Sequence, residues 1–501
     1  MNIKPRVIAL LMALAVLVGA AGSYIGIEYF ANKEGDQSQS EQLANAGKNA
    51  ENFGSLTEEE QKKFIEDMTG NGDLEKVAQA YNVIKENYVE DVDKKQLVEG
   101  AIQGMLDTLE DPYSVYMDQE TMKQFNQSIE SSFEGIGAEV SMVNDKVTIV
   151  APIKGSPAEK AGLKPNDQIL KVDGESVEGL DLYDAVLKIR GEKGTEVTLQ
   201  VDRPGVSDPL NIEIVRDDIP LETVYSDTKE VNGKKVGVIE ITSFSEKTSD
   251  EFHKALQKLE GDEMEGLVID VRGNPGGLFT DVQEILKEFI TDEKPIVQVE
   301  DRKGEKSRYF SDRTEKKDYP ITVLMDEGSA SASEILAATM KEAGGYDLVG
   351  TKSFGKGTVQ QAIPMGDGST IKLTLFKWLT PDGNWIHEKG IEPTVKVKQP
   401  EYFYTNPVEI EEPLKRNDNN DKIKNVQEML KGLGYDPGRT DGYYSKETEA
   451  AVEAFQSDSG LEATGQVDEK TGGKLEEKIV EEVRNEENDR QMEKALEVLF
   501  E

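Results

Sequence analysis

The sequence lacks cysteine altogether and has only two histidines, His253 and His387, among its 501 residues. Without cysteine the chain forms no disulfide, has no thiol nucleophile and builds no thiolate metal site. Two histidines are too few for a three-histidine zinc centre, and a serine–histidine–aspartate triad must use one of these two. We expect a structural role for His387, which stands in the strand-like run GNWIHEKGI, and we expect no metal and no cofactor.

Basic residues are also scarce, since 58 Lys and Arg stand against 98 Asp and Glu, a net charge of -40. Such a charge repels phosphate backbones, so nucleic acid is excluded as a partner. Hydrophobic residues make up 37% of the chain and 45 residues are glycine, which is close to the composition of globular proteins. At ~100 to 200 residues per domain, the length predicts about three domains.

Only one long uncharged run is present, at residues 7–27, and it is long enough to cross a membrane core of ~30 Å. Lys4 and Arg6 precede this run, so the positive-inside rule sends the rest of the chain outside. A cleavable signal peptide is the alternative, because Gly19-Ala20-Ala21 is a small-residue site. We assign 1–31 as a membrane anchor or signal segment, and expect a single-pass protein of the cell membrane with the rest of the chain extracytoplasmic, or a secreted protein.

The exported chain begins with a polar tether, residues 32–72, which is too poor in apolar residues to form a core. Residues 73–125 then carry two apolar stripes at helical spacing, which predict a helical arm. Two helices in so short a region bury little core of their own. We expect them to pack on a second copy of the chain, as in a homodimer, or on another domain.

Residues 130–205 alternate short β-branched runs with glycine-rich and aspartate-rich turns, the pattern of a small β-rich module. The stretches SSFEGIGAEV and KGSPAEKAGLKPNDQILKVDGESV resemble a PDZ domain. The resemblance implies that a loop captures the C-terminal carboxylate of a protein or peptide on its backbone N–H groups. The residues of this predicted loop are Gly135, Ile136, Gly137 and Ala138.

Strand-like and helix-like runs alternate over residues 206–400, which predicts an α/β layer with a mostly parallel sheet. The loop GSASASE, residues 328–334, follows a strand and opens a helix, so it places a hydroxyl at a helix N-terminus that stabilises a developing oxyanion. A capping box between Ser331 and Glu334 is the simpler alternative. The loop RGNPGG, residues 272–277, follows another strand and offers the amide of Gly276 or Gly277 as one oxyanion donor, with the Ala332 amide as the other.

A third loop, TKSFGKGTVQ, spans residues 351–360 and contains Lys356. A lysine becomes a general base only where burial lowers its pKa by roughly 2 to 3 units. Gln360 lies four residues along a strand, on the same face, where its amide oxygen is placed to hold the amine. The three loops together supply a nucleophile, a base and an orienting group.

From Asp111-Pro112-Tyr113-Ser114 to Gly390-Ile391-Glu392-Pro393, the loops and their order resemble the carboxyl-terminal processing peptidases of family S41, which are PDZ-containing Ser-Lys endopeptidases. The resemblance implies that Ser331 is the nucleophile, Lys356 the base and Gln360 its orienter. It also implies that Arg190, in Ile189-Arg190-Gly191, contacts the protease core in the active arrangement, and that the PDZ domain gates access. The alternative is a non-catalytic scaffold whose PDZ module holds a client.

Residues 415–475 carry the pattern VQ..L..LGY.PG..DG, followed by AV..FQ...GL..TG. This pattern resembles the three-helix peptidoglycan-binding domain of bacterial wall enzymes, and it implies the wall polymer as a partner. The acidic tail, 476–501, is amphipathic, and we expect a solvated helix. The sequence thus predicts a multidomain α/β and α+β protein with a helical arm, a PDZ domain, a protease core and a small helical C-terminal domain.

Overall fold

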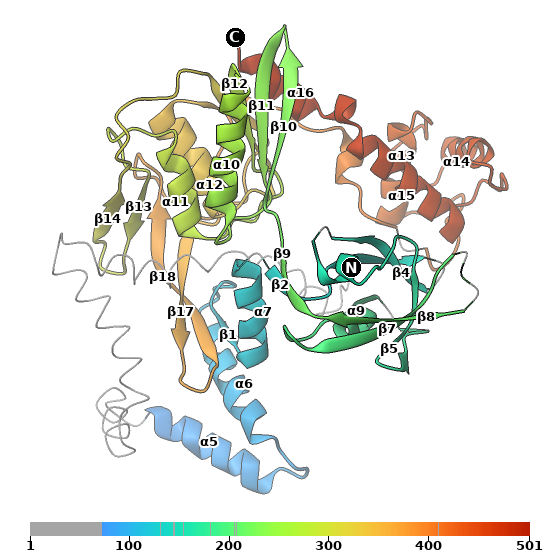
Figure 1. The fold of residues 1–501 in the computed structure, drawn as a ribbon, viewed down its shortest axis with the longest axis horizontal. Coiled ribbons are helices and arrows are strands. Elements are labelled where there is room, and N and C mark those ends of the chain that lie inside the picture. The colour runs from blue at the N-terminus through green and yellow to red at the C-terminus, as the bar shows by residue number, and fades with distance from the viewer. Residues whose placement is uncertain are drawn as a thin grey trace.

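The computed structural model describes residues 73–501 except for positions 131, 144–145, 154, 181, 205, 207 and 409. The predicted anchor or signal segment, 1–31, and the tether, 32–72, lie outside the described residues. In the part of the chain that is described, no helix has both the length and the hydrophobicity to cross a membrane. Figure 1 shows a helical arm in blue, a β-rich domain in teal, an α/β core in green to orange and a helical C-terminal region in red.

The helical arm consists of α5 (Asp73–Asn87) and α6 (Lys94–Asp107), and is followed by β1 (Val115–Met117) and α7 (Gln119–Ile129). Asp93 begins α6 by accepting a hydrogen bond from the amide of Lys95 at 2.7 Å. The apolar stripe of the first helix is largely uncovered, since Val77 and Ile84 are 43% and 42% exposed. The arm therefore presents an apolar face to its surroundings.

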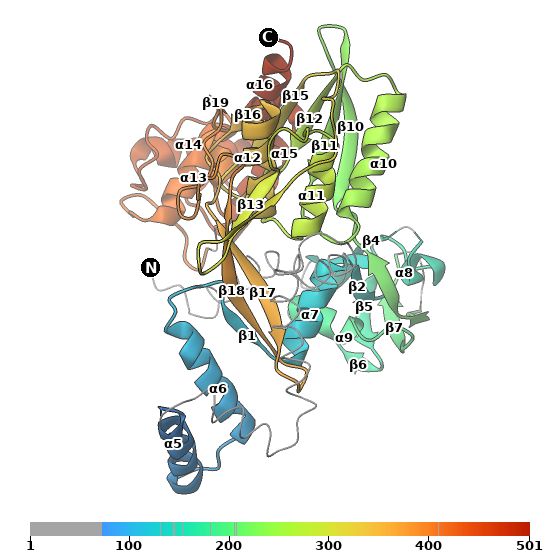
Figure 2. The same ribbon diagram turned by 90° about the vertical axis from the view of Figure 1, so that its left-hand side faces the viewer.

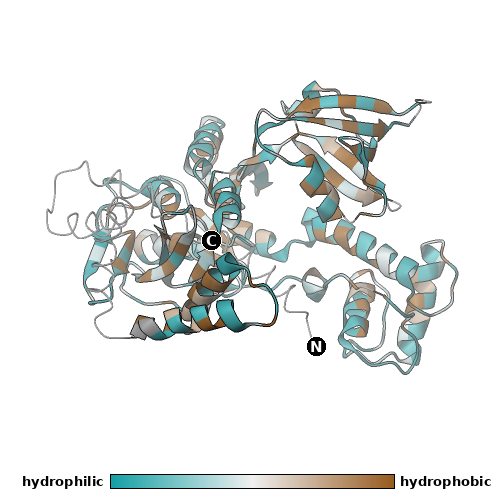
Figure 3. Cartoon of the chain, turned by 90° about the horizontal axis from the view of Figure 1, so that it is seen from below, coloured by the Kyte–Doolittle hydropathy of each residue, from teal (hydrophilic) through white to brown (hydrophobic). Residues whose placement is uncertain are grey.

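The β-rich domain contains a sheet in the order β3-β4-β5-β7-β8, with β6 beside β5. Its elements are β3 (Ala138–Val143), β4 (Lys146–Pro152), α8 (Pro157–Lys160), β5 (Gln168–Val172), β6 (Glu175–Ser176), α9 (Leu182–Ile189), β7 (Glu196–Asp202) and β8 (Leu210–Val215). Hydrophobic and hydrophilic residues alternate along its strands, as the brown and teal bands of Figure 3 show, because one face of each strand meets the core. The last strand, β8, lies beyond the predicted boundary at residue 205.

The chain enters and leaves this domain through one antiparallel ribbon of β2 (Ser132–Gly135) and β9 (Asp217–Pro220). A salt bridge of 2.8 Å from Lys123 in α7 to Glu134 fastens the ribbon to the segment that follows the arm. Both connections of the domain thus run side by side. The β2–β9 pair, named the hinge ribbon from here on, carries both connections of the domain.

The α/β core is built on a sheet in the order β10-β11-β12-β15-β16-β19, in which only β10 runs antiparallel to its neighbour. Its strands are β10 (Val224–Val231), β11 (Lys234–Ile241), β12 (Gly266–Asp270), β15 (Ile321–Met325), β16 (Asp347–Gly350) and β19 (Val395–Lys396). Every residue of β12 and β15 is buried, which is typical of parallel strands that are covered on both faces. The predicted α/β layer is confirmed.

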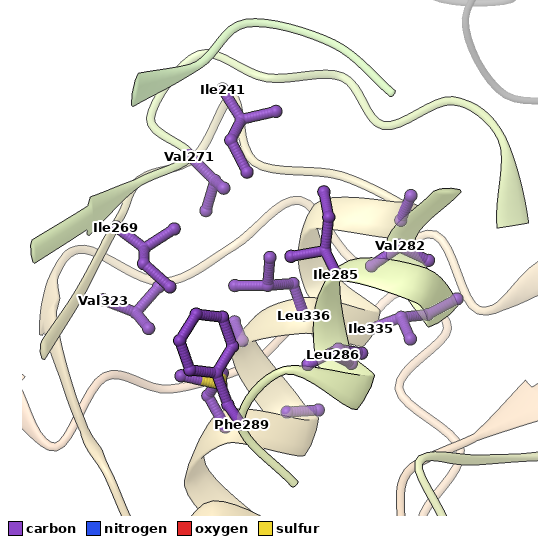
Figure 4. Packing of buried hydrophobic residues seen from close by; sticks show 14 of the residues in the cluster. Ile241, Ile269, Val271, Val282, Ile285, Leu286, Phe289, Val323, Ile335 and Leu336 are labelled. Atoms are coloured by element: carbon purple, nitrogen blue, oxygen red, sulfur yellow. The ribbon is translucent and has the colours of Figure 1, made fainter. Parts of the chain in front are cut away.

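One face of this sheet is covered by α10 (Thr248–Gly261), α11 (Phe279–Lys287) and α12 (Ala332–Thr339), which continues as the π-helical turn η2 (Met340–Gly344). Figure 4 shows Ile269 and Val323 of the strands packing toward Leu286 of α11 and Leu336 of α12. At ~25 cal/mol per Å² of buried apolar surface, this cluster is a main source of the core's stability. It also fixes the start of α12, where Ser331 lies.

A second, antiparallel sheet has the order β1-β18-β13-β14, with β17 paired to β18. Its further strands are β13 (Val297–Glu300), β14 (Lys306–Tyr309), β17 (Thr358–Pro364) and β18 (Thr370–Leu379). Strand β1 comes from the end of the helical arm, so the arm is joined to this sheet by backbone hydrogen bonds. Figure 2 shows β1 beside the long β17–β18 hairpin.

The C-terminal region contains η3 (Glu401–Tyr404), α13 (Asp421–Gly432), α14 (Lys446–Asp458), α15 (Glu469–Arg484), η4 (Glu486–Asn488) and α16 (Arg490–Val498). Helices α13, α14 and α15 enclose one apolar cluster around Val426, Phe455 and Leu475. The expected three-helix arrangement is thus present. Helix α15 extends past residue 475 into the segment that the sequence suggested was an acidic tail.

The expectation of a solvated tail helix is wrong, because α16 packs on the α/β core. Ala495 and Leu499 are buried against Val236, Val268 and Leu324 of the sheet, on the face opposite α10, α11 and α12. The apolar residues of α16 recur at helical spacing and fill the one face that the other helices leave open. Helix α16 therefore completes the α/β sandwich.

Candidate active site

Ser331 lies at the turn from β15 to α12, beyond the carboxyl end of a central parallel strand. Its backbone has φ 54° and ψ -111°, a conformation that residues with a Cβ rarely adopt. Ser331 is 7% exposed, so a small part of it remains accessible. The structure thus places this serine at the N-terminus of a helix, as the sequence predicts, where the helix dipole favours negative charge.

The glycine loop lies directly against this serine. A Cβ on Gly276 would stand 2.8 Å from Ser331 Cβ and 2.6 Å from the carbonyl oxygen of Ala330. A Cβ on Gly277 would overlap the carbonyl oxygen of Phe244. Both positions also have positive φ, so only glycine allows the main chain to approach the serine this closely.

The two glycines differ in the hydrogen bonds that their amides make. The Gly276 amide donates to Asn274 Oδ1 at 2.8 Å, which occupies its hydrogen. In this structure the amide of Gly276, a predicted oxyanion donor, is therefore taken by a side chain within its own loop. Gly277 and Ala332 are the candidate donors, and a Cβ on Gly276 would stand 3.0 Å from the Ala332 nitrogen, so the two loops meet there.

Asn274 organises this contact, a role that the sequence analysis missed. The residue is fully buried, and its Nδ2 donates to the Ile241 carbonyl at 2.7 Å. Its own carbonyl accepts hydrogen bonds from the Ala330 amide at 3.0 Å and from Ser333 Oγ at 2.9 Å. Asn274 thereby ties the glycine loop to the serine loop. The asparagine within RGNPGG was the available signal, but its partners lie far away in the sequence.

Lys356 lies in the loop before β17 and is 3% exposed. Burial lowers the pKa of its amine to about 8, although the charges of Asp111 and Glu334 act to raise it. Among the described residues, its Nζ meets no hydrogen-bond acceptor, and it stands 4.7 Å from the ring centroid of Tyr113. A substantial fraction of this amine is therefore neutral near pH 8, as a general base requires.

Glu334 holds the serine and lysine loops together and is fully buried. One carboxylate oxygen accepts from the amides of Ser331 at 2.9 Å and Lys356 at 2.8 Å. The other accepts from Ser353 Oγ at 2.6 Å and the Gly355 amide at 2.7 Å. Burial raises the pKa of this carboxyl, whereas the four hydrogen bonds favour the charged form. The sequence analysis considered Glu334 only as a helix cap and missed this role.

Gln360 is 1% exposed on β17, but its observed hydrogen bonds differ from the prediction. Its Nε2 donates to the hydroxyls of Thr358 and Thr374, each at 2.9 Å. The expected hydrogen bond from Lys356 to its amide oxygen is not formed, because the lysine amine faces Tyr113 instead. The structure therefore brings Gln360 into the buried surroundings of the site without joining it to the base.

His387 takes the structural position that the sequence predicts. Its ring stacks on Trp385, with centroids 5.2 Å apart, and its Nδ1 accepts from the Gly357 amide at 3.4 Å. The Trp385 indole donates to the Gly357 carbonyl at 2.7 Å. Together these rings support the backbone that follows Lys356.

The predicted peptide-binding loop, residues 135–138, joins β2 to β3 at the edge of the β-rich domain. The carbonyl of Ile136 accepts from the Ala158 amide at 2.8 Å, and that of Gly137 accepts from Ser156 Oγ at the same distance. Gly137 has φ 74°, and a Cβ there would come within 2.5 Å of Ser156 Cβ. The start of α8 thus fixes the loop through its carbonyl groups.

Arg190, the predicted gating residue, directly follows α9 and lies at the hinge ribbon. Its guanidinium carbon is 5.0 Å from the ring centroid of Phe133 in β2. A charged group over an aromatic face is attracted by the ring quadrupole. In this structure Arg190 therefore contacts the ribbon through which the β-rich domain is attached.

Four family profiles match the chain. Peptidase family S41 matches residues 235–397, and a PDZ domain matches 135–214. The N-terminal domain of the activating protease CtpB matches 16–121, and a peptidoglycan binding domain matches 419–475. The PDZ, protease and wall-binding resemblances found in the sequence are confirmed by these matches.

Whole-chain comparisons agree with these profiles. The chain is 52% identical over 495 residues to the carboxy-terminal processing protease CtpB of Bacillus subtilis, covering 99% of both chains. It is 45% identical over 431 residues to CtpA of the same organism, covering 86% of this chain and 91% of the relative. Among solved structures, the photosystem II D1 C-terminal processing protease is 26% identical with a TM-score of 0.42, covering 68% of this chain and 94% of that chain.

Proposed function

Because this chain belongs to the carboxy-terminal processing proteases of peptidase family S41, we propose that Ser331 and Lys356 are the nucleophile and general base of this serine-type protease. The observation that carries the proposal is the shared carboxylate of Glu334, which binds the backbone amides of both residues. The burial of Lys356 supports it, since a lysine whose pKa is about 8 gives up its proton readily.

In the proposed reaction, the neutral Lys356 amine removes the proton from Ser331 Oγ as this oxygen bonds to the scissile carbonyl carbon. The negative charge passes to the carbonyl oxygen, where the amides of Gly277 and Ala332 stabilise it. The Lys356 ammonium then donates its proton to the leaving amine as the C–N bond breaks, which leaves an acyl-enzyme. A water molecule then attacks the ester carbon while Lys356 takes its proton, and Lys356 returns this proton to Ser331 Oγ as the ester C–O bond breaks and the acyl group leaves as a carboxylic acid.

Before the first step, the Lys356 amine must turn from Tyr113 toward Ser331. We infer that Gln360 receives the amine after this turn, since its side chain is buried on the strand that directly follows the lysine loop. The conformation described here is then a resting form. The hinge ribbon beside Arg190 suggests how a bound peptide changes it.

Ser331→Ala and Lys356→Ala should each abolish cleavage of a peptide with a free apolar C-terminus, with little change in the unfolding temperature. A serine-reactive phosphonate should label the wild type and fail to label the Ser331 variant. Full cleavage by either variant contradicts the dyad. Circular dichroism of both variants separates lost chemistry from lost folding.

We further infer that the PDZ domain gates this dyad. Its loop at residues 135–138 suits capture of a C-terminal carboxylate, and the peptide would add a strand to the domain. Capture would turn the domain about the β2–β9 ribbon and move Arg190 from Phe133 to the protease core. Arg190→Ala should then lower turnover of a protein substrate while leaving the affinity for its C-terminal peptide unchanged. Equal loss of turnover and affinity contradicts the gate.

We also propose that the protein is exported and works at the cell wall, on the basis of the uncharged run at residues 7–27 and the wall-binding match. The catalytic part would then lie outside the cytoplasmic membrane. The Ser331→Ala protein should co-sediment with purified peptidoglycan. In whole cells, external protease should degrade the catalytic part. If the protein stays in the supernatant, it does not bind the wall polymer. If external protease leaves the catalytic part intact in whole cells, the protein is not exported.

The helical arm supports a homodimer, because its apolar face is left uncovered in this chain. Val77, Ile84 and Tyr88 are 43%, 42% and 60% exposed, and a second arm would remove this surface from water. Ile84→Lys should convert a dimer to a monomer in light-scattering measurements. A wild-type monomer at micromolar concentration contradicts this proposal.

A further inference from the structure

Tyr113 enters the active site from the helical arm. It belongs to the loop of residues 111–114, between α6 and β1, and β1 pairs with β18 so that Val115 is opposite Lys372. Figures 1 and 2 show β1 beside the β17–β18 hairpin, with α6 leading away from the core. Tyr113 is thereby fixed relative to β18, the strand that pairs with the Gln360-carrying β17.

The Tyr113 ring is the group over which the Lys356 amine lies, at 4.7 Å from the ring centroid. Nζ has no hydrogen-bond acceptor among the described residues, and the face of this ring is the direct contact described for it. An aromatic face attracts an ammonium ion through its quadrupole, whereas a neutral amine gains little. The observed contact therefore favours the protonated lysine, which is the form that cannot act as a base.

Asp111 holds the loop around Tyr113 in place through two hydrogen bonds. Its amide donates to Asp111 Oδ1 at 3.0 Å, and Ser114 Oγ donates to Asp111 Oδ2 at 2.6 Å. Ser114 Oγ in turn accepts from the Thr374 amide at 3.0 Å, and the Thr374 hydroxyl accepts from Gln360 at 2.9 Å. A continuous set of hydrogen bonds thus runs from the loop of the arm to the predicted orienter of the base.

Charged groups face Lys356 from three other elements. Asp111 of the arm loop and Glu334 of α12 favour its protonated form. Lys372 of β18 is fully buried, and the two lysines repel each other's charge. The Tyr113 ring also lies near the His387 ring, with centroids 6.5 Å apart and an interplanar angle of 64°. The ring is therefore one of several opposing influences on whether this lysine carries a proton.

On the premise that the proposed dyad is correct, we propose that Tyr113 is a positioning residue for Lys356, whose ring holds the protonated amine away from Ser331 and so delays its use as a base. Because the ring is supplied by the helical arm, an altered arm changes the availability of the base. The conformation of the arm thereby affects the rate of catalysis, in addition to any effect of the PDZ domain.

The test is the pH dependence of kcat/KM for a peptide with a free C-terminus, measured on the full chain. Tyr113→Leu removes the ring, so the lysine loses its proton more readily and the acid limb should move to lower pH by about 0.5 to 1.5 units. Tyr113→Phe keeps the ring face and should retain the wild-type acid limb. Tyr116→Leu is the matched control, because it removes a ring from β1 whose hydroxyl lies 3.4 Å from Glu99.

A second series removes any dependence on how well the leucine variant folds. Phenylalanine and its trifluoro and pentafluoro analogues at position 113 keep nearly the same shape while electron density is withdrawn from the ring face. The acid limb should move progressively to lower pH along this series. A fixed limb in both experiments, with only kcat reduced, overturns the role of Tyr113 and leaves the dyad intact. Full activity of Lys356→Ala overturns the dyad itself, so the two failures are distinguishable.

Discussion

Glu334 accepts a hydrogen bond from the amide of Lys356 at 2.8 Å through the same oxygen that accepts from the amide of Ser331 at 2.9 Å. One buried carboxylate therefore sets the distance between the two loops that carry the proposed nucleophile and base. The strained backbone of Ser331 is held by this bond and by the glycine loop beneath it. Anything that alters the carboxylate alters both partners of the dyad together.

Glu334→Gln should reduce kcat/KM by about 100-fold or more, because loops that shift by about 1 Å lose catalytic alignment. An amide offers only one acceptor oxygen, so backbone donors become unpaired, and the free energy of unfolding should fall by about 1–3 kcal/mol. The measurements are steady-state kinetics and chemical denaturation. Glu265→Gln, at an exposed position, is the matched control and should change neither. Wild-type kinetics in the Glu334 variant would show that the carboxylate does not position the dyad.

The activity should depend on pH through Lys356, whose pKa burial lowers to about 8. The amine is protonated and inactive below this value and neutral above it, so kcat/KM should rise with pH. Well below pH 8 the slope should approach tenfold per pH unit. The pH profile of kcat/KM, recorded with a neutral peptide, measures this rise. A flat profile between about pH 6 and 8 would exclude Lys356 as the titrating base.

Gly276→Ala should abolish activity, since its Cβ would meet the Ala330 carbonyl oxygen at 2.6 Å and Ser331 Cβ at 2.8 Å. Gly273→Ala is the matched control in the same loop. Both positions have positive φ, but a Cβ on Gly273 meets no described atom within 4 Å. The control therefore carries the backbone strain without the collision. Cleavage assays should show a much larger loss for Gly276, and equal losses would assign the effect to strain alone.

Asp489→Asn should destabilise the protein, because Asp489 joins the segment before α16 to the core by a 2.8 Å ion pair with Arg272. Although burial acts to raise it, the hydrogen bonds and charge of Arg272 hold the pKa of Asp489 below its ordinary value. The stabilisation is thus full above about pH 3.9 and is lost as the pH falls through the lowered pKa.

At neutral pH we expect the Asp489 variant to lose about 1–3 kcal/mol of unfolding free energy in denaturant titrations. Glu486→Gln is the control. Glu486 forms a 2.5 Å ion pair with Lys229, but its side chain is 75% exposed. That variant should change stability by less than about 0.5 kcal/mol. Similar effects for both variants would show that the Arg272 pair does not anchor the tail.

The sequence predicted that Ser331 and Lys356 lie in short loops between a strand and the next element, and both do; their roles came from the resemblance to family S41 and stay predictions. It did not reveal the four hydrogen bonds of Glu334, since Lys356 is 22 residues away and only the folded chain brings it back. The occupied amide of Gly276 depends on the rotamer of Asn274, which no spacing predicts. Fold class and domain resemblances followed from patterns that are local in the chain.

The tail was misjudged for a different reason. Its apolar residues recur at helical spacing, but acidic residues surround them, and local charge favoured a solvated helix. Whether such a stripe is buried depends on whether a complementary face is open elsewhere. Here β11, β12 and β15 leave one face uncovered by α10, α11 and α12, and that face is distant in sequence from α16.

The position of α16 has a consequence for the order in which the protein matures. The helix follows the wall-binding domain in the chain, so a ribosome finishes residues 419–475 before it makes the element that covers the sheet. Until then Val236, Val268 and Leu324 present an apolar surface that chaperones can bind. The second face of the sheet is therefore covered only after the region that matches a peptidoglycan-binding domain has been made.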